Sequence, residues 1–293
     1  MSVKRLFILG VFFVALTSGC SLKTFVATHM SGSIEDMNTA FMEEPSVKHA
    51  RAAAPALLKM LDGFIVSAPR DKSLLAAGAQ MNCGFAMLLI EDEDPYWASA
   101  LYKKGFEYAL RGLDEERRGI SKLVEKGDLK ALKRNLEELD RDDLPLIFWA
   151  GECLAGWINL NLDDPEAISN LPVALSFVKR ALKIDDTYFY GGGHMVLAVY
   201  YGTMGKAVGG DPKKSKAEFE KVFKITHNKF MLAKVLYAKT YCVQVQNKEE
   251  FEKALDEVDD FDVDSVPELR LVNSVAKLKA ERLREEEDDK FLN

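Results

Sequence analysis

The chain has 293 residues, and its 39 lysines and arginines against 46 aspartates and glutamates give a formal net charge of −7. Because an acidic surface repels the phosphate backbone, this balance argues against nucleic acid as a partner. The length is sufficient for one large domain or for an array of helical repeats.

The N-terminal residues have the features of a secretory signal peptide. Lys4 and Arg5 precede an apolar run from Leu6 to Leu16, which is shorter than the about 20 apolar residues that span a bilayer. Small residues then lead to Cys20, as in bacterial lipoproteins, whose signal is cut before a cysteine that carries lipid on its sulfur. Thr17 stands where an aliphatic residue is usual, so an ordinary secretory signal with an incidental cysteine is the alternative.

This interpretation divides the chain into a lipoprotein signal peptide (1–19), a lipidated tether (20–32) and one folded domain (33–293). Removing the leader takes away two basic residues and leaves 37 basic against 46 acidic residues, a net charge of −9. Each buried methylene of an acyl chain contributes about 0.8 kcal/mol, and two chains give stable anchoring. Cys20 is therefore the predicted lipid site.

Almost all of the domain is predicted to be helical, because apolar residues recur three or four positions apart and no apolar–polar alternation is long enough for a strand. Asp94-Pro95, Asp211-Pro212 and Val266-Pro267 are typical of helix starts, and Pro55 falls inside a helical run that it would kink. The fold class is all-α. In chain order, the expected helices are 33–43, 46–67, 71–92, 95–118, 128–139, 144–161, 171–184, 189–206, 212–226, 230–245, 248–258 and 267–287.

One helical register recurs, in which an aromatic residue or valine is followed by alanine or valine and then by a large apolar residue. Its small third positions are Ala109, Ala181, Val222 and Ala254, which are 72, 41 and 32 residues apart. The tetratricopeptide (TPR) repeat has a period of about 34 residues. The spacing therefore predicts a TPR-like α-solenoid of stacked helical hairpins with degenerate units, and a generic helical array with chance phasing is the alternative.

Three cysteines remain in the domain, Cys83, Cys153 and Cys242, about 70 and 90 residues apart and without a CxxC pair. Each lies in an apolar helical stretch, so we expect buried free thiols. An odd number argues against a disulfide framework, although the compartment of an exported protein would permit one bridge.

The sequence offers no convincing motif for catalysis, a metal or a cofactor. Its four histidines are scattered and lack a second ligand at metal spacing. The glycines at 191–193 have no preceding strand and no following Lys-Ser/Thr, so close helix packing explains them better than phosphate binding. Asp185, Asp186 and Asp211 are expected to cap helices. An enzyme that acts on a small acid through His194 and Asp185 is a further hypothesis.

One helical face is the best candidate for contact with a ligand. Tyr190, His194, Leu197 and Tyr201 fall at i, i+4, i+7 and i+11. Two phenols and an imidazole there could contact a carboxylate or an amphiphile, which makes Tyr190, His194 and Tyr201 candidate cavity-lining residues. The alternative is that they are core aromatics with satisfied polar tips. The tryptophans, Trp97, Trp149 and Trp157, are expected to pack inside.

Taken together, six stretches resemble the T component of TRAP transporters (TatT). They are Ala54–Leu58 with Leu61-Asp62-Gly63, Leu101–Gly105 with Tyr108–Leu113, Trp149-Ala150 with Gly156-Trp157-Ile158, Asp185–His194 with Tyr200-Tyr201, Gly209–Pro212, and Lys229–Ala238. The resemblance covers nearly the whole mature chain. One departure is the additional Gly193 before His194.

The resemblance implies an accessory periplasmic lipoprotein that is built of TPR-like hairpins. It also implies a homotrimer. Its expected partners are the substrate-binding P component and the membrane subunits of a tripartite ATP-independent periplasmic (TRAP) transporter. A cavity through each protomer is expected to pass an organic acid or an apolar molecule. The family supplies no catalytic residue, so none is assigned. The rival hypothesis is an envelope scaffold or assembly lipoprotein with TPR repeats and no role in transport.

Overall fold

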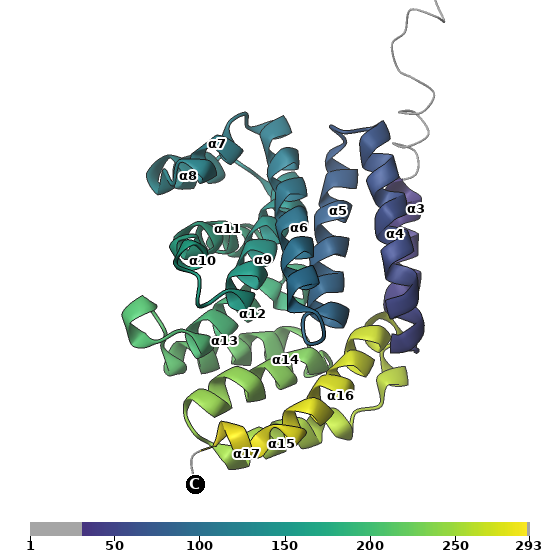
Figure 1. Ribbon diagram of the computed structural model, residues 1–293, viewed down its shortest axis with the longest axis vertical. Coiled ribbons are helices and arrows are strands. Elements are labelled where there is room, and N and C mark those ends of the chain that lie inside the picture. Colours follow the sequence, from purple (N-terminus) through teal and green to yellow (C-terminus); the bar gives the residue numbers. More distant parts are fainter. Residues whose placement is uncertain (1–30, 292–293) are drawn as a thin grey trace, which may run out of the picture.

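The computed structural model describes residues 31–291, and every regular element in that range is a helix (Figure 1). The prediction of an all-α fold is therefore confirmed. The expected signal peptide, the lipid site Cys20 and nearly all of the expected tether lie outside the described residues, and they stay predictions. The division at residue 33 likewise stays a prediction.

The helices follow one another with short connections. The α-helices are α3 (Ser31–Met42), α4 (Val47–Ser67), α5 (Lys72–Phe85), α6 (Pro95–Glu116), α7 (Ile120–Glu125), α8 (Leu129–Leu136), α9 (Leu144–Leu160), α10 (Pro165–Ser169), α11 (Leu171–Ile184), α12 (Tyr188–Thr203), α13 (Pro212–Ile225), α14 (Met231–Tyr237), α15 (Lys248–Asp259), α16 (Arg270–Glu285) and α17 (Glu287–Lys290). The π-helical segments η1 (Ala86–Ile90) and η4 (Ala238–Cys242) continue α5 and α14. The 3₁₀ turns are η2 (Arg141–Asp143), η3 (Lys206–Val208), η5 (Val263–Ser265) and η6 (Pro267–Leu269).

Two of the expected helix starts are fixed by a side chain that caps the first turn of the helix. The Asp94 carboxylate accepts a hydrogen bond from the Trp97 amide at 2.9 Å, and Pro95 occupies the first turn of α6. Asp211 caps α13 in the same way, by accepting from two amides of its first turn. Each cap satisfies an amide that a helix N-terminus otherwise leaves unpaired. Val266-Pro267 differs, since it starts the turn η6, and α16 begins only at Arg270.

Helices that are close in sequence pack side by side. Contacts are densest between α5 and α6, α6 and α9, α9 and α11, and α12 and α13. This local pairing is compatible with stacked hairpins, but the TPR-like solenoid itself stays a prediction. The stretch Lys72–Ile90 is long and apolar enough to cross a membrane by length and composition, yet most of it is buried inside the protein. It serves as a core element here, and both α6 and α9 pack on it.

The last long helix returns to the first part of the chain, where α16 lies beside α3 and α4 (Figure 1). Side chains of α16 bond to the residues that follow α3 and to those that follow η1. Arg270 donates to the Glu43 carbonyl at 3.1 Å, Lys279 donates to Glu91 at 3.2 Å, and Arg282 donates to Glu93 at 2.7 Å. The two ends of the helical array are thus joined, and the helices that meet there enclose a cavity.

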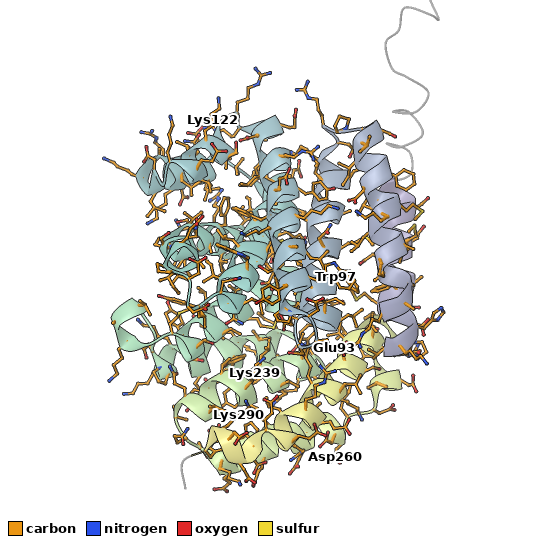
Figure 2. All side chains as sticks on the ribbon, viewed as in Figure 1. Glu93, Trp97, Lys122, Lys239, Asp260 and Lys290 are labelled. Carbon is orange, nitrogen blue, oxygen red and sulfur yellow. A yellow bond between two sulfur atoms is a disulfide. The ribbon has the colours of Figure 1, made fainter. Side chains whose placement is uncertain are left out.

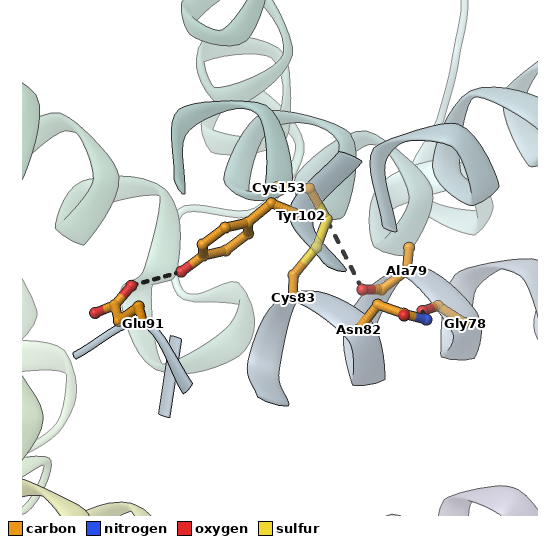
Figure 3. The surroundings of a disulfide bond; sticks show 7 residues. All are labelled: Gly78, Ala79, Asn82, Cys83, Glu91, Tyr102 and Cys153. Carbon is orange, nitrogen blue, oxygen red and sulfur yellow. Dashed lines mark hydrogen bonds between the residues drawn. A yellow bond between two sulfur atoms is a disulfide. The ribbon is translucent and has the colours of Figure 1, made fainter. Parts of the chain in front are cut away.

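The expectation of three free thiols is wrong for two of them. Cys83 on α5 and Cys153 on α9 form a disulfide, with their Cα atoms 5.5 Å apart (Figure 3). The pairing follows from the packing of α5 on α9, which brings together two cysteines separated by 70 residues. Cys242 is free and buried as expected, and burial raises the pKa of its thiol to about 12.

A third helix, α6, packs against the disulfide, and its residue at the point of contact is a glycine. A Cβ atom at Gly105 would overlap the Sγ atoms of both Cys83 and Cys153. Glycine at this position therefore lets α6 approach the bridge closely. One turn earlier on α6, the buried hydroxyl of Tyr102 donates to the Glu91 carboxylate at 2.8 Å (Figure 3).

Candidate ligand cavity

An apolar cavity lies where the two ends of the helical array meet. The space between its wall atoms is about 840 Å³, counted to include its opening to solvent. Most of its lining is aliphatic, aromatic or methionine, with Asn38, Gln80, Glu268 and the Tyr190 hydroxyl as the polar groups. The lining residues are Asn38, Phe41, Met42, Ala54, Leu57, Leu58, Gln80, Met81, Gly84, Phe85, Met87, Leu88, Leu89, Trp149, Phe189, Tyr190, Phe230, Glu268, Leu269 and Val272. A concave apolar site with a few polar groups is typical of small-molecule binding.

Two aromatic walls of the cavity come from a strained turn at the start of α12. Phe189, Tyr190 and Gly191 have φ values of 46°, 59° and 73°, and so lie consecutively in the left-handed region. This conformation costs roughly 1–2 kcal/mol for each residue other than glycine. Phe189 packs edge-on against Trp149 with ring centroids 4.8 Å apart, and Tyr190 stacks on Phe230 at 5.3 Å. These aromatic contacts offset the backbone strain and hold both rings in the cavity wall.

Tyr190 is the predicted site residue that reaches the cavity. Its side chain remains 37% exposed, which places it where the cavity meets solvent. Burial of the rest of the ring and the nearby Glu268 carboxylate both raise the pKa of its hydroxyl. At neutral pH the group is therefore an uncharged hydrogen-bond donor beside a carboxylate.

His194 is buried and bonded to protein groups away from the cavity lining. It is 7% exposed, its Nδ1 lies 2.6 Å from Glu218 Oε2, and its Nε2 lies 4.0 Å from Asp186. Burial alone would raise the pKa of Glu218, but hydrogen bonds from His194 and Lys221 hold it below its ordinary value. The pair joins α12 to α13. The carboxylate of Asp185 binds Arg141 and Thr187, so the structure does not assemble the His194–Asp185 pair of the enzyme hypothesis.

Tyr201 lies on another surface of α12. It packs at the edge of a small apolar cluster of Val178, Val196 and Leu197, with the Lys214 ammonium 5.4 Å from its ring centroid. The structure therefore does not bring Tyr190, His194 and Tyr201 to one ligand surface. The left-handed turn rotates Tyr190 out of the helical register that His194 and Tyr201 share.

Several cavity residues carry no distinctive sequence pattern. Met87, Phe230 and Glu268 come from different parts of the chain, and only tertiary packing makes them neighbours. Phe189 could have been found, since an aromatic run followed by three glycines suits an irregular backbone. Trp149 is buried as expected, whereas Trp97 is 40% exposed, packs edge-on against Phe85 and was wrongly expected inside. Within residues 31–291, no three His, Cys, Asp or Glu side chains are grouped to hold a metal.

Comparison with known proteins identifies the family. The model of the TRAP transporter T-component family matches residues 43–291. The chain belongs to this family. It is also similar to an uncharacterized protein of Treponema pallidum (strain Nichols), with 22% identity over an alignment of 306 positions that covers 95% of each chain. The T component is a transport accessory, so the family places the chain with envelope-associated TRAP transporters. The matched region holds the whole cavity except the side contributed by α3.

Proposed function

We propose that this T component is a periplasmic lipoprotein, anchored through Cys20, that binds the substrate-binding P component of its transporter. In this proposal, the P component and the T component exchange a small organic acid or apolar ligand, which passes through the cavity of each protomer. Family membership supports the association with a transporter. The observation that carries the ligand part is the cavity inside the matched fold, whose lining is mostly apolar and includes few polar groups.

The construction of the cavity supports a binding role over simple packing. Protein interiors are close-packed and leave few voids larger than a water molecule, so packing alone does not account for a lined apolar hollow that opens to solvent. Here, two left-handed aromatic residues, Phe189 and Tyr190, are held at its wall despite the strain. Strained backbone of this kind clusters at ligand sites.

The partner is tested by isolating the T component from detergent-solubilised membranes of its own organism and identifying what accompanies it. We expect the P component and the TRAP membrane subunits. A Cys20→Ala control should leave the membrane fraction, because its lipid site is gone. Failure to recover either kind of subunit in several mild detergents would contradict the proposal.

The ligand path is tested by filling the cavity. Val272 lines it, so Val272→Trp should abolish binding of a simple apolar probe, octanol, measured by calorimetry. Tyr201→Trp is the matched control, since Tyr201 packs outside the cavity and its replacement should leave octanol binding unchanged. Equal effects of the two substitutions would contradict passage through this cavity.

The oligomeric state and the rival role need separate measurements. We expect a homotrimer in light scattering of the protein in mild detergent. An envelope scaffold without a transport role would share the fold and the anchor, but it would not need a ligand cavity. A gene for a P component beside the gene for this chain supports the transport proposal, and recovery of envelope assembly proteins in its place supports the scaffold.

A further inference from the structure

A second hollow, which we call the charged groove, adjoins the apolar cavity. It lies between η1, the α14–η4 segment and α16, and the space between its wall atoms is about 630 Å³, counted to include its opening to solvent. Its apolar lining includes Leu232, Val235 and Leu283, all buried. Its charged lining lies nearer to solvent and includes Lys239, labelled with Glu93 in Figure 2. The groove is thus amphipathic.

Met87 is the wall between the two hollows, since its side chain lines both of them. A methionine has three rotatable bonds and adapts its shape readily, so a change of rotamer could join the two spaces. Met87 also belongs to the π-helical segment η1, and Lys239 belongs to the other π-helical segment, η4. Single π-helical turns are rare and frequently occur at functional sites. Both such turns in the described chain border this one groove.

The cations of the groove differ in how closely they are paired with carboxylates. Lys279 donates to Glu91 at 3.2 Å and also to Asp92, and Arg282 donates to Glu93 at 2.7 Å. Lys239 is 46% exposed, and the nearest acidic oxygen recorded for it within residues 31–291 is Asp92 Oδ1 at 3.9 Å. That oxygen belongs to a carboxylate already bonded to Lys279. Lys239 is therefore the cation most able to accept a new anionic partner.

The charges also distinguish the groove from the other polar part of the cavity. Glu268 lies beside Tyr190 and would repel an anionic head group there. Beyond Met87, the groove also contains carboxylates, but Glu91 and Asp92 are bonded to Lys279, and Glu286 pairs with Lys290. An anion that enters there meets the ammonium of Lys239. An amphiphile with one anionic end is thus favoured in one orientation, with its tail in the apolar cavity and its head in the groove.

We propose that the charged groove binds the carboxylate of an amphiphilic organic acid through Lys239, while the apolar tail passes Met87 into the cavity. The proposal rests on the proposed function, because it assumes that the cavity takes a ligand. It adds the head-group chemistry, the residue that recognises it and the direction in which the ligand lies.

The test compares two probes with the same eight-carbon tail, octanoate and octanol, by calorimetry at pH 8. The protein carries Cys20→Ala so that no detergent is needed. Lys239→Gln should weaken octanoate binding about three- to tenfold, the range expected for loss of a partly exposed charged hydrogen bond, and should leave octanol binding unchanged. Lys122→Gln is the matched control, because Lys122 is an exposed lysine on α7, far from Lys239 in Figure 2. It should change neither affinity.

A second substitution tests the connection at Met87. Met87→Trp should close the passage, so that octanoate loses its dependence on Lys239 and Lys239→Gln has no further effect in that background. Lys239 is exposed, so its single substitution remains informative even if Met87→Trp fails to fold. Octanoate affinity that is insensitive to Lys239→Gln while octanol still binds would overturn the groove proposal and leave the cavity proposal standing. Failure of both probes to bind the Cys20→Ala protein would overturn both.

Discussion

Replacing Glu152 by glutamine should stabilise the protein, and the gain should depend on pH. Glu152 lies on α9 and is only 9% exposed, and no ion pair is recorded for it within residues 31–291. Burial, together with repulsion from Glu91, raises the pKa of its carboxyl to about 7 from 4.5. Tyr102 lies near Glu152 and donates to the repelling Glu91, which also pairs with Lys279 of α16.

Proton linkage gives the direction and the size of the effect of Glu152 on the free energy of unfolding. Below pH 4.5, Glu152 is protonated in the folded and unfolded states alike, so it has no effect on stability. Between pH 4.5 and 7, the unfolded chain ionises while the folded chain stays neutral, and stability falls as pH rises. Each pKa unit corresponds to 1.36 kcal/mol, so the cost above pH 7 is about 3 kcal/mol. Glutamine cannot ionise and should avoid this cost.

Urea unfolding of both proteins at pH 4.5 and pH 8 measures the effect. Glu152→Gln should be more stable by about 3 kcal/mol at pH 8 and nearly unchanged at pH 4.5. The exposed Glu107 on the neighbouring helix α6 supplies a control, since Glu107→Gln should show no comparable gain at either pH. An equal difference between wild type and Glu152→Gln at the two pH values would refute the reasoning, because it would mean that Glu152 is charged in the fold.

Three further changes test the packing. The double substitution of Cys83→Ser and Cys153→Ser should lower the free energy of unfolding by about 4 kcal/mol, because the bridge closes a loop of 70 residues. An unchanged free energy of unfolding under oxidising conditions would show that the bridge does not form. Gly105→Ala should lower the melting temperature and slow disulfide formation in a thiol assay, because its Cβ would overlap both sulfurs; normal oxidation would contradict this contact. His194→Ala should cost about 2 kcal/mol through loss of its hydrogen bond to Glu218, with octanol binding retained; loss of octanol binding without loss of stability would instead place His194 in the ligand path.

The features that sequence reasoning found are those that short-range chemistry decides. Asp94 and Asp211 start helices because each caps amides within three residues, and the all-α class follows from helical periodicity along the chain. The disulfide was missed because only the packing of α5 on α9 makes Cys83 and Cys153 neighbours. An odd cysteine count could not reveal that pairing.

The candidate site was found in part for a similar reason. A helical wheel placed Tyr190 beside His194 and Tyr201, but it assumes right-handed residues throughout, and Phe189–Gly191 are left-handed. The extra glycine before His194 was a visible sign of irregular backbone there. The π-helical turns, which place Met87 and Lys239, leave no comparable sign in the sequence, because their composition is that of an ordinary helix.

The return of α16 to the start of the array fixes the number of helices that the protein can contain. An open stack of hairpins gains or loses a unit with little penalty, since each unit contacts only its neighbours. Here an inserted hairpin would displace Lys279 and Arg282 from Glu91 and Glu93, and so would separate the two halves of the cavity wall. Growth of this protein by repeat duplication would therefore destroy the chamber, whereas lengthening of the loops away from α16 would preserve it.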